Sequence, residues 1–330
     1  MKLQAKVALV AGGAGFIGSH LCDRLIAEAD VVVCLDNFLT GRRENIRHLE
    51  DHPRFRLAVH DVVDEVPGWL EAAGVSHVFH LASPASPPHY QADPERTLIT
   101  NVVGTRNLLR LAERSGARLL LASTSEVYGN AEVHPQREDY RGSVSCTGPR
   151  ACYDEGKRAA ETLAFDFRRA GRSDVRVARI FNTYGPRMRA DDGRVVSNIV
   201  CQAIEGRDIT VYGDGSQTRS FCFVDDTVEA LLRLMDSGDP GTPVNIGNPE
   251  EVTIRALVER VVNLSGSAAR IVLRPLPIDD PRRRRPDIGL ARRLLGWQPT
   301  VALDDGLKAT IAWFERHESR SLPDALLAAE

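Results

Sequence analysis

Tyr153 and Lys157 are the residues whose types and spacing most directly suggest chemistry. Side chains four positions apart share one face of a helix, so a phenol and an ammonium at this spacing can reach the same point. A free phenol has a pKa of about 10 and is a poor base at neutral pH, but a nearby positive charge favours the phenolate. Only four of the 42 basic residues are lysines, so a chance pair of this kind is rare. The pair therefore predicts a general base.

The hydroxyl-bearing segment STSE, residues 123–126, stands at the end of a predicted strand, Leu119–Thr124. In doubly wound sheets, ligands bind beyond the carboxyl ends of the strands. A hydroxyl at this position can hydrogen-bond the substrate oxygen from which Tyr153 would take a proton. The alternative is a polar strand end that only caps the following turn.

A glycine-rich turn, GGAGFIG at residues 12–18, lies between a predicted strand and a predicted helix. Gly12, Gly15 and Gly18 would let the backbone approach a pyrophosphate that the helix N-terminus stabilises. Asp36 ends the second predicted strand, 24 residues after Gly12, where its carboxylate can bind ribose hydroxyls and would repel a 2′-phosphate. The glycines alone could form a flexible loop, but together with Asp36 they predict a site for NAD rather than NADP.

These residues require a scaffold of alternating strands and helices, and the sequence has that rhythm. Strands are predicted over Lys6–Val10, Val31–Asp36, Phe55–Asp61, His77–Ser83, Leu119–Thr124 and Val175–Phe181. Helices are predicted over Phe16–Ala29, Pro94–Ser115 and Tyr153–Ala170. Several strands are apolar almost throughout, as strands covered on both faces should be. The expected fold is therefore an α/β fold, a Rossmann-type doubly wound parallel sheet.

The rhythm changes after Asn182, which predicts a smaller C-terminal α/β substrate-binding domain. Its expected elements are helices at Val195–Glu205 and Asp226–Met235 and strands at Ile209–Tyr212, Ser220–Val224 and Val244–Ile246. The prediction is an NAD-binding domain over residues 1–182, with a return at residues 225–248, and a substrate-binding domain over residues 183–330. The tail after Glu318 is expected to be disordered.

Composition argues against several classes of function. A net charge of −3 provides no basic field for nucleic acid, and the run Arg282–Arg285 is interpreted as a solvated edge. The six cysteines form no CxxC pair and the nine histidines form no ligand pattern, so no metal site is expected. No segment approaches the roughly 18 apolar residues that span a bilayer. We expect a cytoplasmic protein with no nucleic-acid or membrane partner.

Taken in order along the chain, these features resemble the extended short-chain dehydrogenase/reductase family, and within it the nucleotide-sugar epimerases, dehydratases and decarboxylases. The resemblance is closest to the UDP-glucuronate decarboxylases and covers roughly residues 6–315. It is carried by the runs HLASPASPPHY (80–90), LLASTSEVYG (120–129), GPRACYDEGKRAAET (148–162), RIFNTYGPRM (179–188), DDGRVVSN (191–198), VYGDGSQTRSF (211–221) and RPDI followed by LGW (285–297).

The resemblance implies roles for single residues of this chain. A catalytic group is implied at Thr124, Glu126, Tyr153 and Lys157. NAD contacts are implied at Gly12, Gly15, Phe16, Ile17, Gly18, Asp36, Asn37, Phe38, Asp61, Val62, Leu81 and Ser83, together with Tyr153 and Lys157. Contacts to a nucleotide-sugar substrate are implied at Glu126, Asn182, Arg194, Tyr212, Gln217, Arg219 and Arg284. A homodimer is implied through the helices that contain Leu98–Leu111 and Ala159–Phe167.

The expected reaction is decarboxylation of UDP-glucuronate to UDP-xylose with NAD as a retained cofactor. Tyr153 would take the 4-hydroxyl proton while carbon 4 gives a hydride to NAD, and the resulting β-keto acid would lose carbon dioxide before the hydride returns. Related 4,6-dehydratases have an acidic Asp where this chain has Ser125, which favours decarboxylation over dehydration. Ile99 replaces the usual lysine of the glucuronate decarboxylases, and Ser143–Thr147 departs from their usual Asn-Pro form. The choice between UDP- and dTDP-glucuronate therefore stays open.

Three other functions fit parts of the pattern. A nucleotide-sugar 4-epimerase or a 4,6-dehydratase would share the first step of the reaction. A non-catalytic NAD-binding regulator on the same fold would retain the glycines without needing Tyr153 and Lys157. Release of carbon dioxide from a nucleotide-linked glucuronate separates the decarboxylase from all three.

Overall fold

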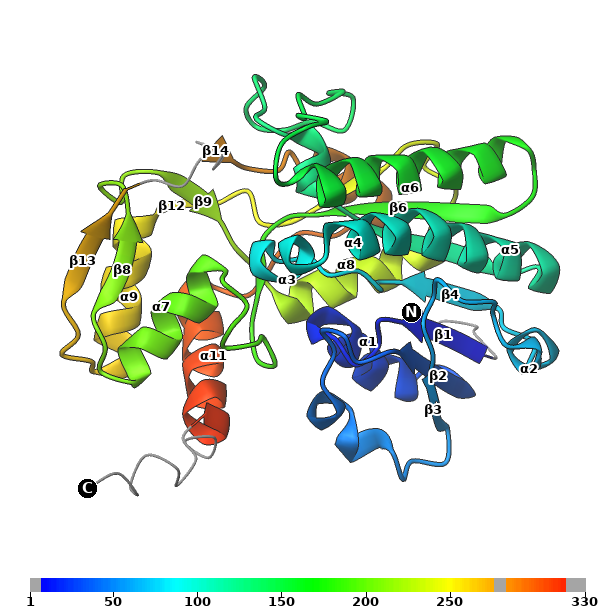
Figure 1. The fold of residues 1–330 in the computed structure, drawn as a ribbon, viewed down its shortest axis with the longest axis horizontal. Helices are drawn as coiled ribbons and strands as arrows, with labels where there is room; N and C mark the ends of the chain where they lie inside the picture. The colour runs from blue at the N-terminus through cyan, green and yellow to red at the C-terminus, as the bar shows by residue number, and fades with distance from the viewer. Residues whose placement is uncertain (1–6, 276–282, 319–330) are drawn as a thin grey trace.

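A seven-stranded parallel sheet forms the centre of the molecule in the computed structural model, which describes residues 7–275 and 283–318 (Figure 1). The strand order is β3-β2-β1-β4-β5-β6-β11, so the direction in which strands are added reverses between β1 and β4. This confirms the predicted Rossmann-type doubly wound sheet, in which ligands bind at such a reversal. The strands are β1 (Val7–Ala11), β2 (Val31–Asp36), β3 (Phe55–Val59), β4 (His77–His80), β5 (Arg118–Thr124), β6 (Asp174–Ile180) and β11 (Val244–Ile246).

Helices cover both faces of this sheet, which explains why its strands are apolar almost throughout. Successive residues of a strand point to opposite faces. Val10 accordingly joins the core cluster of the first face, whereas Leu9 joins the cluster of the second. The covering helices are α1 (Phe16–Ile26) and α8 (Val224–Asp236) on the first face and α2 (Gly68–Ala72), α5 (Thr105–Ser115) and α6 (Ala151–Arg169) on the second.

The single helix predicted over residues 94–115 is divided by one wider turn. It consists of α4 (Pro94–Ile99), the π-helical turn η3 (Thr100–Gly104) and α5, and it follows the short helix α3 (Pro87–Ala92). In the wider turn, Gly104 passes so close to Val62 that a Cβ on Gly104 would lie 2.6 Å from the Val62 Cγ2 atom. The apolar periodicity that predicted the helix contains no sign of this contact.

The chain after β6 forms a smaller lobe, apart from α8 and β11, which belong to the central sheet and its covering layer (Figure 1). In this lobe the helix α9 (Ile254–Ser265) is capped by the Thr253 hydroxyl, which accepts a hydrogen bond from the Ala256 amide at 3.1 Å. Gly266, with a φ of +65°, follows its last residue. Its helices are α7 (Val195–Ile204), α9 (Ile254–Ser265) and α11 (Leu303–Glu318), while α10 (Gly289–Leu295) packs beside α8 and β11. Its strands are β7 (Thr183–Tyr184), β8 (Ile209–Tyr212), β9 (Thr218–Ser220), β10 (Cys222–Phe223), β12 (Glu251–Thr253), β13 (Ile271–Arg274) and β14 (Arg283–Arg284).

The sequence predicted that the basic run Arg282–Arg285 is a solvated edge. This prediction is wrong for Arg284, which is only 2% exposed. Arg284 lies on β14, which pairs with β9, and its guanidinium binds the Glu126 carboxylate at 3.1 Å. A buried arginine is tolerated when a carboxylate neutralises it, and Glu126 is far away in sequence. Arg282 and the tail after Glu318, predicted to be disordered, lie outside the described residues.

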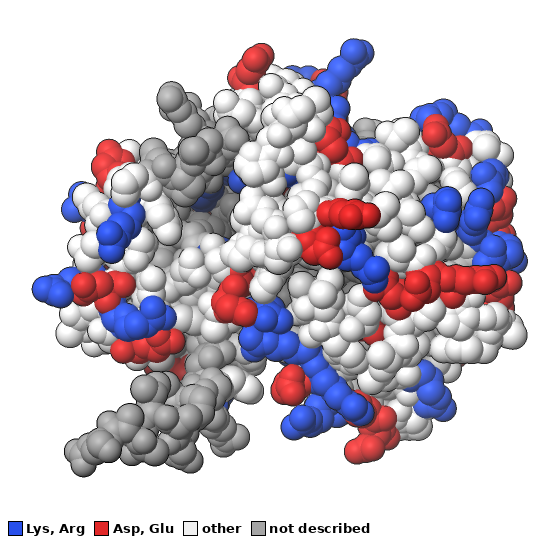
Figure 2. All heavy atoms as spheres, viewed as in Figure 1, with Lys and Arg blue, Asp and Glu red and all other residues white. Residues whose placement is uncertain are grey.

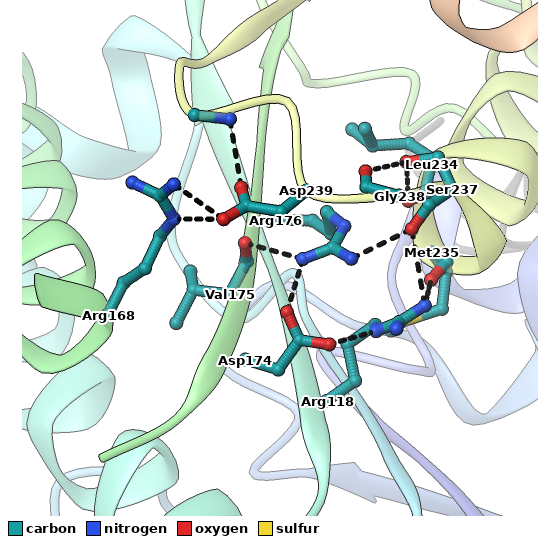
Figure 3. A network of polar contacts seen from close by, with 11 residues as sticks. Arg118, Arg168, Asp174, Val175, Arg176, Leu234, Met235, Ser237, Gly238 and Asp239 are labelled. Carbon is teal, nitrogen blue, oxygen red and sulfur yellow. Dashed lines mark hydrogen bonds and ion pairs between the residues drawn. The ribbon is translucent and has the colours of Figure 1, made fainter. Parts of the chain in front are cut away.

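A network of arginines ties the end of α8 to the amino-terminal edge of the sheet (Figure 3). Arg118, at the start of β5, donates to the carbonyl of Met235 at 2.6 Å, and Arg176, on β6, donates to the carbonyl of Ser237 at 2.8 Å. Both guanidinium groups also bind Asp174. The last carbonyls of a helix have no partner within the helix. The arginines supply these partners and fix α8 against β5 and β6.

Charged side chains of both signs are interspersed on the face shown in Figure 2. Many of them form surface ion pairs, such as Arg43 with Glu50 at 2.8 Å, and pairs of this kind contribute little to stability. Within residues 7–275 and 283–318, no helix is both long enough and apolar enough to cross a bilayer.

Candidate active site

A cavity of about 780 Å³ is lined by the carboxyl ends of the central strands and by residues of the smaller lobe. Every residue assigned from the sequence to catalysis or to the sugar nucleotide lines it: Thr124, Glu126, Tyr153, Lys157, Asn182, Arg194, Tyr212, Gln217, Arg219 and Arg284. The residues assigned to NAD also line it, with the exception of Phe38 and Asp61. Phe38 packs against the hydrophobic core, and Asp61 forms an ion pair with Arg96.

The glycine-rich turn lines one end of the cavity and leaves no room for side chains. Gly12 has a φ of +80°, and a Cβ there would lie 2.7 Å from the amide nitrogen of Ala82. A Cβ on Gly18, in the first turn of α1, would lie 2.1 Å from the carbonyl oxygen of Gly12. Bare backbone therefore stands in front of the N-terminus of α1, which is the arrangement that holds a pyrophosphate.

Asp36 ends β2 and lines the same end of the cavity. Its two carboxylate oxygens accept hydrogen bonds from the amides of Ala14 at 2.9 Å and Phe38 at 2.8 Å, so it joins the glycine-rich turn to the loop after β2. Burial raises the pKa of Asp36, and these two amides oppose the rise. The remaining lone pairs of the carboxylate can accept from ribose hydroxyls. The glycine-rich turn and Asp36 together fit NAD.

Tyr153 and Lys157 lie on the face of α6 turned toward the end of β5, and they are 5% and 3% exposed. The Lys157 ammonium donates to the carbonyl of Ala122 at 2.9 Å and lies 5.9 Å from the centre of the Tyr153 ring. The side chain of Thr124 forms a hydrogen bond with the Tyr153 phenol. The structure thus brings a phenol, an ammonium and a hydroxyl together at one wall of the cavity.

The pKa of the Tyr153 phenol is raised to about 12 by burial, although a hydrogen bond with Thr124 and the charge of Arg194 act in the opposite direction. Burial also lowers the pKa of Lys157, to about 8. From the sequence we expected the Lys157 ammonium, together with the positive nicotinamide ring of NAD, to favour the phenolate. Without NAD, burial raises the pKa of Tyr153 more than the Thr124 hydrogen bond and the Arg194 charge lower it. A further positive charge beside the phenol is needed to form the phenolate at neutral pH.

Glu126 also lines the cavity and is surrounded by guanidinium groups. Arg150 donates to its carboxylate, and Arg284 binds the same oxygen at 3.1 Å. Burial would raise the pKa of Glu126, but the charges of Arg284, Arg150, Arg219 and Arg194 hold it below its ordinary value. The site therefore contains an ionised carboxylate and an excess of positive charge, which suits a ligand with several anionic groups.

Tyr90 and Arg150 are among the lining residues that were not predicted from the sequence. The Tyr90 ring stacks on Tyr153 with centroids 5.0 Å apart and planes 2° apart. Its hydroxyl is buried without a hydrogen-bond partner among the described residues. Arg150 precedes Tyr153 by three residues, so helical spacing could have indicated it. Tyr90 gave only the weaker signal of ending the run HLASPASPPHY.

Ile99, which we expected to affect contact with the substrate, is not among the residues that line the cavity. It is 36% exposed on α4, while the next residue, Thr100, does line the cavity. The segment Ser143–Thr147 is also not part of the lining, and Ser143 pairs with Gly129. These two departures from the family pattern therefore provide no argument for one nucleotide over another.

The chain is similar to known proteins over most of its length. The model of a family described as the NAD dependent epimerase/dehydratase family matches residues 8–247. The chain is 54% identical over 311 residues to UDP-glucuronic acid decarboxylase 1 of Danio rerio, and the matched region covers 94% of this chain and 73% of that protein. It is 54% identical over 316 residues to UDP-glucuronic acid decarboxylase 4 of Arabidopsis thaliana, and the matched region covers 96% of this chain and 70% of that protein. A solved structure of UDP-glucuronic acid 4-epimerase from Bacillus cereus, in complex with UDP-glucuronic acid and NAD, matches with a TM-score of 0.84 at 28% identity, over 94% of this chain and 99% of that one.

Proposed function

This chain belongs to the NAD dependent epimerase/dehydratase family, and from that premise we propose that it decarboxylates a nucleotide-linked glucuronate. The proposed substrate is UDP-glucuronate, the product is UDP-xylose and the cofactor is NAD. The observation that carries the proposal is the 54% identity, over 94% of the chain, to a UDP-glucuronic acid decarboxylase.

The charges in the cavity support a substrate that carries both a diphosphate and a carboxylate. Guanidinium groups bind either anion with two parallel hydrogen bonds. Arg150 and Arg284 contact Glu126 beside Thr124, so we assign them to the sugar end of the substrate. The nucleotide end of the substrate is assigned to Asn182 and to four lining residues of the smaller lobe, which are Arg194, Tyr212, Gln217 and Arg219.

The residues around Tyr153 can perform each step of the proposed reaction. Tyr153 takes the proton of the 4-hydroxyl, and the Thr124 hydroxyl donates a hydrogen bond to the oxygen on carbon 4. When bound, NAD supplies the acceptor for the hydride that leaves carbon 4, and it supplies a positive charge beside the Tyr153 phenol. The 4-ketone lies β to the carboxylate, so carbon dioxide leaves as the ketone oxygen takes the electron pair, and hydrogen bonds from Thr124 and Tyr153 stabilise this enolate. A proton from solvent then adds to carbon 5. Return of the hydride to carbon 4, with Tyr153 giving its proton back to the oxygen on that carbon, would complete the pentose.

Ser125 supports decarboxylation over dehydration. A 4,6-dehydratase must protonate the hydroxyl that leaves carbon 6, and a serine cannot supply that proton at neutral pH. Carbon dioxide leaves as a neutral molecule and needs no acid. A 4-epimerase is the competing assignment, because the Bacillus cereus enzyme is in complex with UDP-glucuronic acid. Its 28% identity, however, is far below the 54% shared with the decarboxylase.

Incubation of the protein with UDP-glucuronate and NAD tests this proposal. We expect carbon dioxide and a UDP-pentose, detected by mass spectrometry, and no 4-keto-6-deoxy product from UDP-glucose or dTDP-glucose. UDP-galacturonate without carbon dioxide would instead identify a 4-epimerase. Dehydration of a nucleotide-glucose with both glucuronates untouched would identify a dehydratase. Turnover of dTDP-glucuronate alone would leave the chemistry in place and change the base.

A homodimer is the second part of this proposal. Most apolar residues of the helices implicated from the sequence, such as Leu108 and Phe167, pack on the protein's own sheet. The outer surface of these helices still carries apolar side chains, since Leu98 is 39% and Ile99 36% exposed on α4. Leu163, on the adjacent helix α6, is only partly buried. We infer that a second copy of the chain covers this surface of α4 and α6.

Light scattering at micromolar concentration should give twice the chain mass of 36.3 kDa for the wild-type protein. Leu98→Glu places a charge in the proposed contact and should weaken dimerisation at least about tenfold. Leu273→Glu, at a residue 60% exposed on β13, is the matched control and should leave the mass unchanged. A wild-type monomer under these conditions would refute the dimer.

A further inference from the structure

The contacts of Tyr153 and Lys157 with the end of β5 are continued by a third residue of α6. Glu161, one turn beyond Lys157, accepts a hydrogen bond from the hydroxyl of Ser123 at 2.5 Å. Ser123 stands between Ala122, whose carbonyl binds Lys157, and the residue whose hydroxyl meets Tyr153. Three successive turns of α6 thus hold three successive residues of β5.

The Glu161 carboxylate is fixed from its other side by Arg179 on β6. Two parallel hydrogen bonds join them, at 3.0 Å from Nε to Oε1 and at 2.8 Å from Nη2 to Oε2. Arg179 also donates to the Tyr128 hydroxyl at 3.0 Å and to the Glu138 carbonyl at 3.1 Å. Glu161 is 7% exposed, and a buried carboxylate held by a bidentate guanidinium and a hydroxyl has one defined position.

Glu161 also acts on Lys157 through its charge. Burial lowers the pKa of Lys157 to about 8, and the negative charge of Glu161 opposes this fall. Tyr153 on the same helix and His80 on β4 also lie near Lys157, and Arg179 on β6 binds Glu161. His80 is neutral, because burial and the charge of Lys157 lower its pKa to about 3. The ammonium is present below the pKa of Lys157, so removal of the Glu161 charge would shift its loss to lower pH.

We propose that Glu161 is a positioning residue for the decarboxylation, an inference that rests on the proposed function. It holds Ser123 so that the neighbouring Thr124 faces Tyr153, and it keeps Lys157 protonated. Glu161 is not part of the cavity lining, so it acts through these neighbours rather than on the substrate. An ion pair with Arg179 that served only to join α6 to β6 would change stability when lost, but it would not move the titration of Lys157.

The charge effect can be measured without turnover, because the chain has only four lysines, Lys2, Lys6, Lys157 and Lys308. Labelling lysine Cε with ¹³C gives few NMR signals, and the signal missing in Lys157→Met identifies that residue. We expect the midpoint of the Lys157 titration to fall by about one pH unit in Glu161→Gln. Glu155→Gln is the matched control on the same helix, where a half-exposed glutamate pairs with Arg158 at 3.4 Å, and it should leave the midpoint unchanged.

Turnover of UDP-glucuronate measures the positional effect. Glu161→Gln should lower kcat about 10- to 100-fold with KM changed less than about twofold, because small misplacements of reacting groups have effects of this size. In Glu161→Gln the alkaline limb of the plot of kcat against pH should move to lower pH, together with the midpoint of the Lys157 titration. Glu161→Asp keeps the charge but shortens the side chain, so it should restore the alkaline limb without the full kcat. Ser123→Ala should lower kcat and leave the alkaline limb in place.

Glu161→Gln leaves a buried, unpaired guanidinium that could prevent folding. The double variant Glu161→Gln/Arg179→Met buries no unpaired charge. It should also show a downward shift of the Lys157 titration, smaller than in Glu161→Gln because the positive charge of Arg179 is lost as well. An unmoved Lys157 midpoint in both variants would overturn the proposal, whatever the change in stability. If the wild-type protein turns over neither glucuronate, the proposed function fails instead, and the titration alone decides whether Glu161 controls the charge of Lys157.

Discussion

Replacement of Tyr153 by phenylalanine should lower kcat at least about 100-fold while NAD stays bound. The substitution removes only the phenolic oxygen, which is the proposed proton acceptor for the 4-hydroxyl. It retains the aromatic ring that stacks on Tyr90 at 5.0 Å, so the shape of the cavity should be preserved. Release of carbon dioxide from UDP-glucuronate measures turnover, and the NAD released from denatured protein measures cofactor content.

Tyr140→Phe is the matched control for this experiment. Tyr140 is not among the residues that line the cavity, and its hydroxyl accepts one hydrogen bond, from the Glu132 amide at 3.2 Å. Its loss should leave kcat within about twofold, as is usual for substitutions away from a functional site. Retention of more than about a tenth of wild-type turnover in Tyr153→Phe would contradict the assignment of Tyr153 as the base.

Most of the central sheet could be predicted because its signals are local. Runs of β-branched and other apolar residues predicted Val31–Asp36 and Val244–Ile246, and the structure has strands with those bounds. The π-helical turn η3 could not be predicted in this way. It brings Gly104 against Val62, and a contact between residues so far apart in sequence leaves no periodic pattern in either segment.

The candidate site also contains residues that local spacing could predict and residues that only tertiary contacts bring into place. The spacing of Tyr153 and Lys157 already places them on one helical face, whatever the rest of the fold. The burial of Arg284 depends on Glu126, 158 residues away, so a basic run between prolines gave the appearance of a solvated edge. Pairing of distant charges and stacking of distant rings are set by tertiary structure. For this reason only the family resemblance indicated Arg284, which lines the cavity, as a site residue, and Tyr90 was missed.

Gly18→Ala should weaken NAD binding more than about 100-fold and lower turnover with it. The added Cβ would lie 2.1 Å from the carbonyl oxygen of Gly12, 2.9 Å from its carbonyl carbon and 2.9 Å from the Cα of Gly13. All three are backbone atoms, so relief requires the glycine-rich turn or the first turn of α1 to move. Either movement displaces the amides that face the pyrophosphate. Titration calorimetry with NAD should show Kd raised more than about 100-fold, a loss of about 2.7 kcal/mol.

Gly68→Ala separates this steric effect from the general effect of adding a methyl group near the start of a helix. Gly68 is the first residue of α2, and a Cβ there would meet nothing within 4 Å. Alanine is favoured over glycine in helices by up to about 1 kcal/mol, so propensity alone favours both substitutions. Opposite results for NAD binding would therefore isolate the contact between Gly18 and Gly12. Circular dichroism should show both variants folded, and wild-type NAD affinity in folded Gly18→Ala would mean that the pyrophosphate lies elsewhere in the cavity.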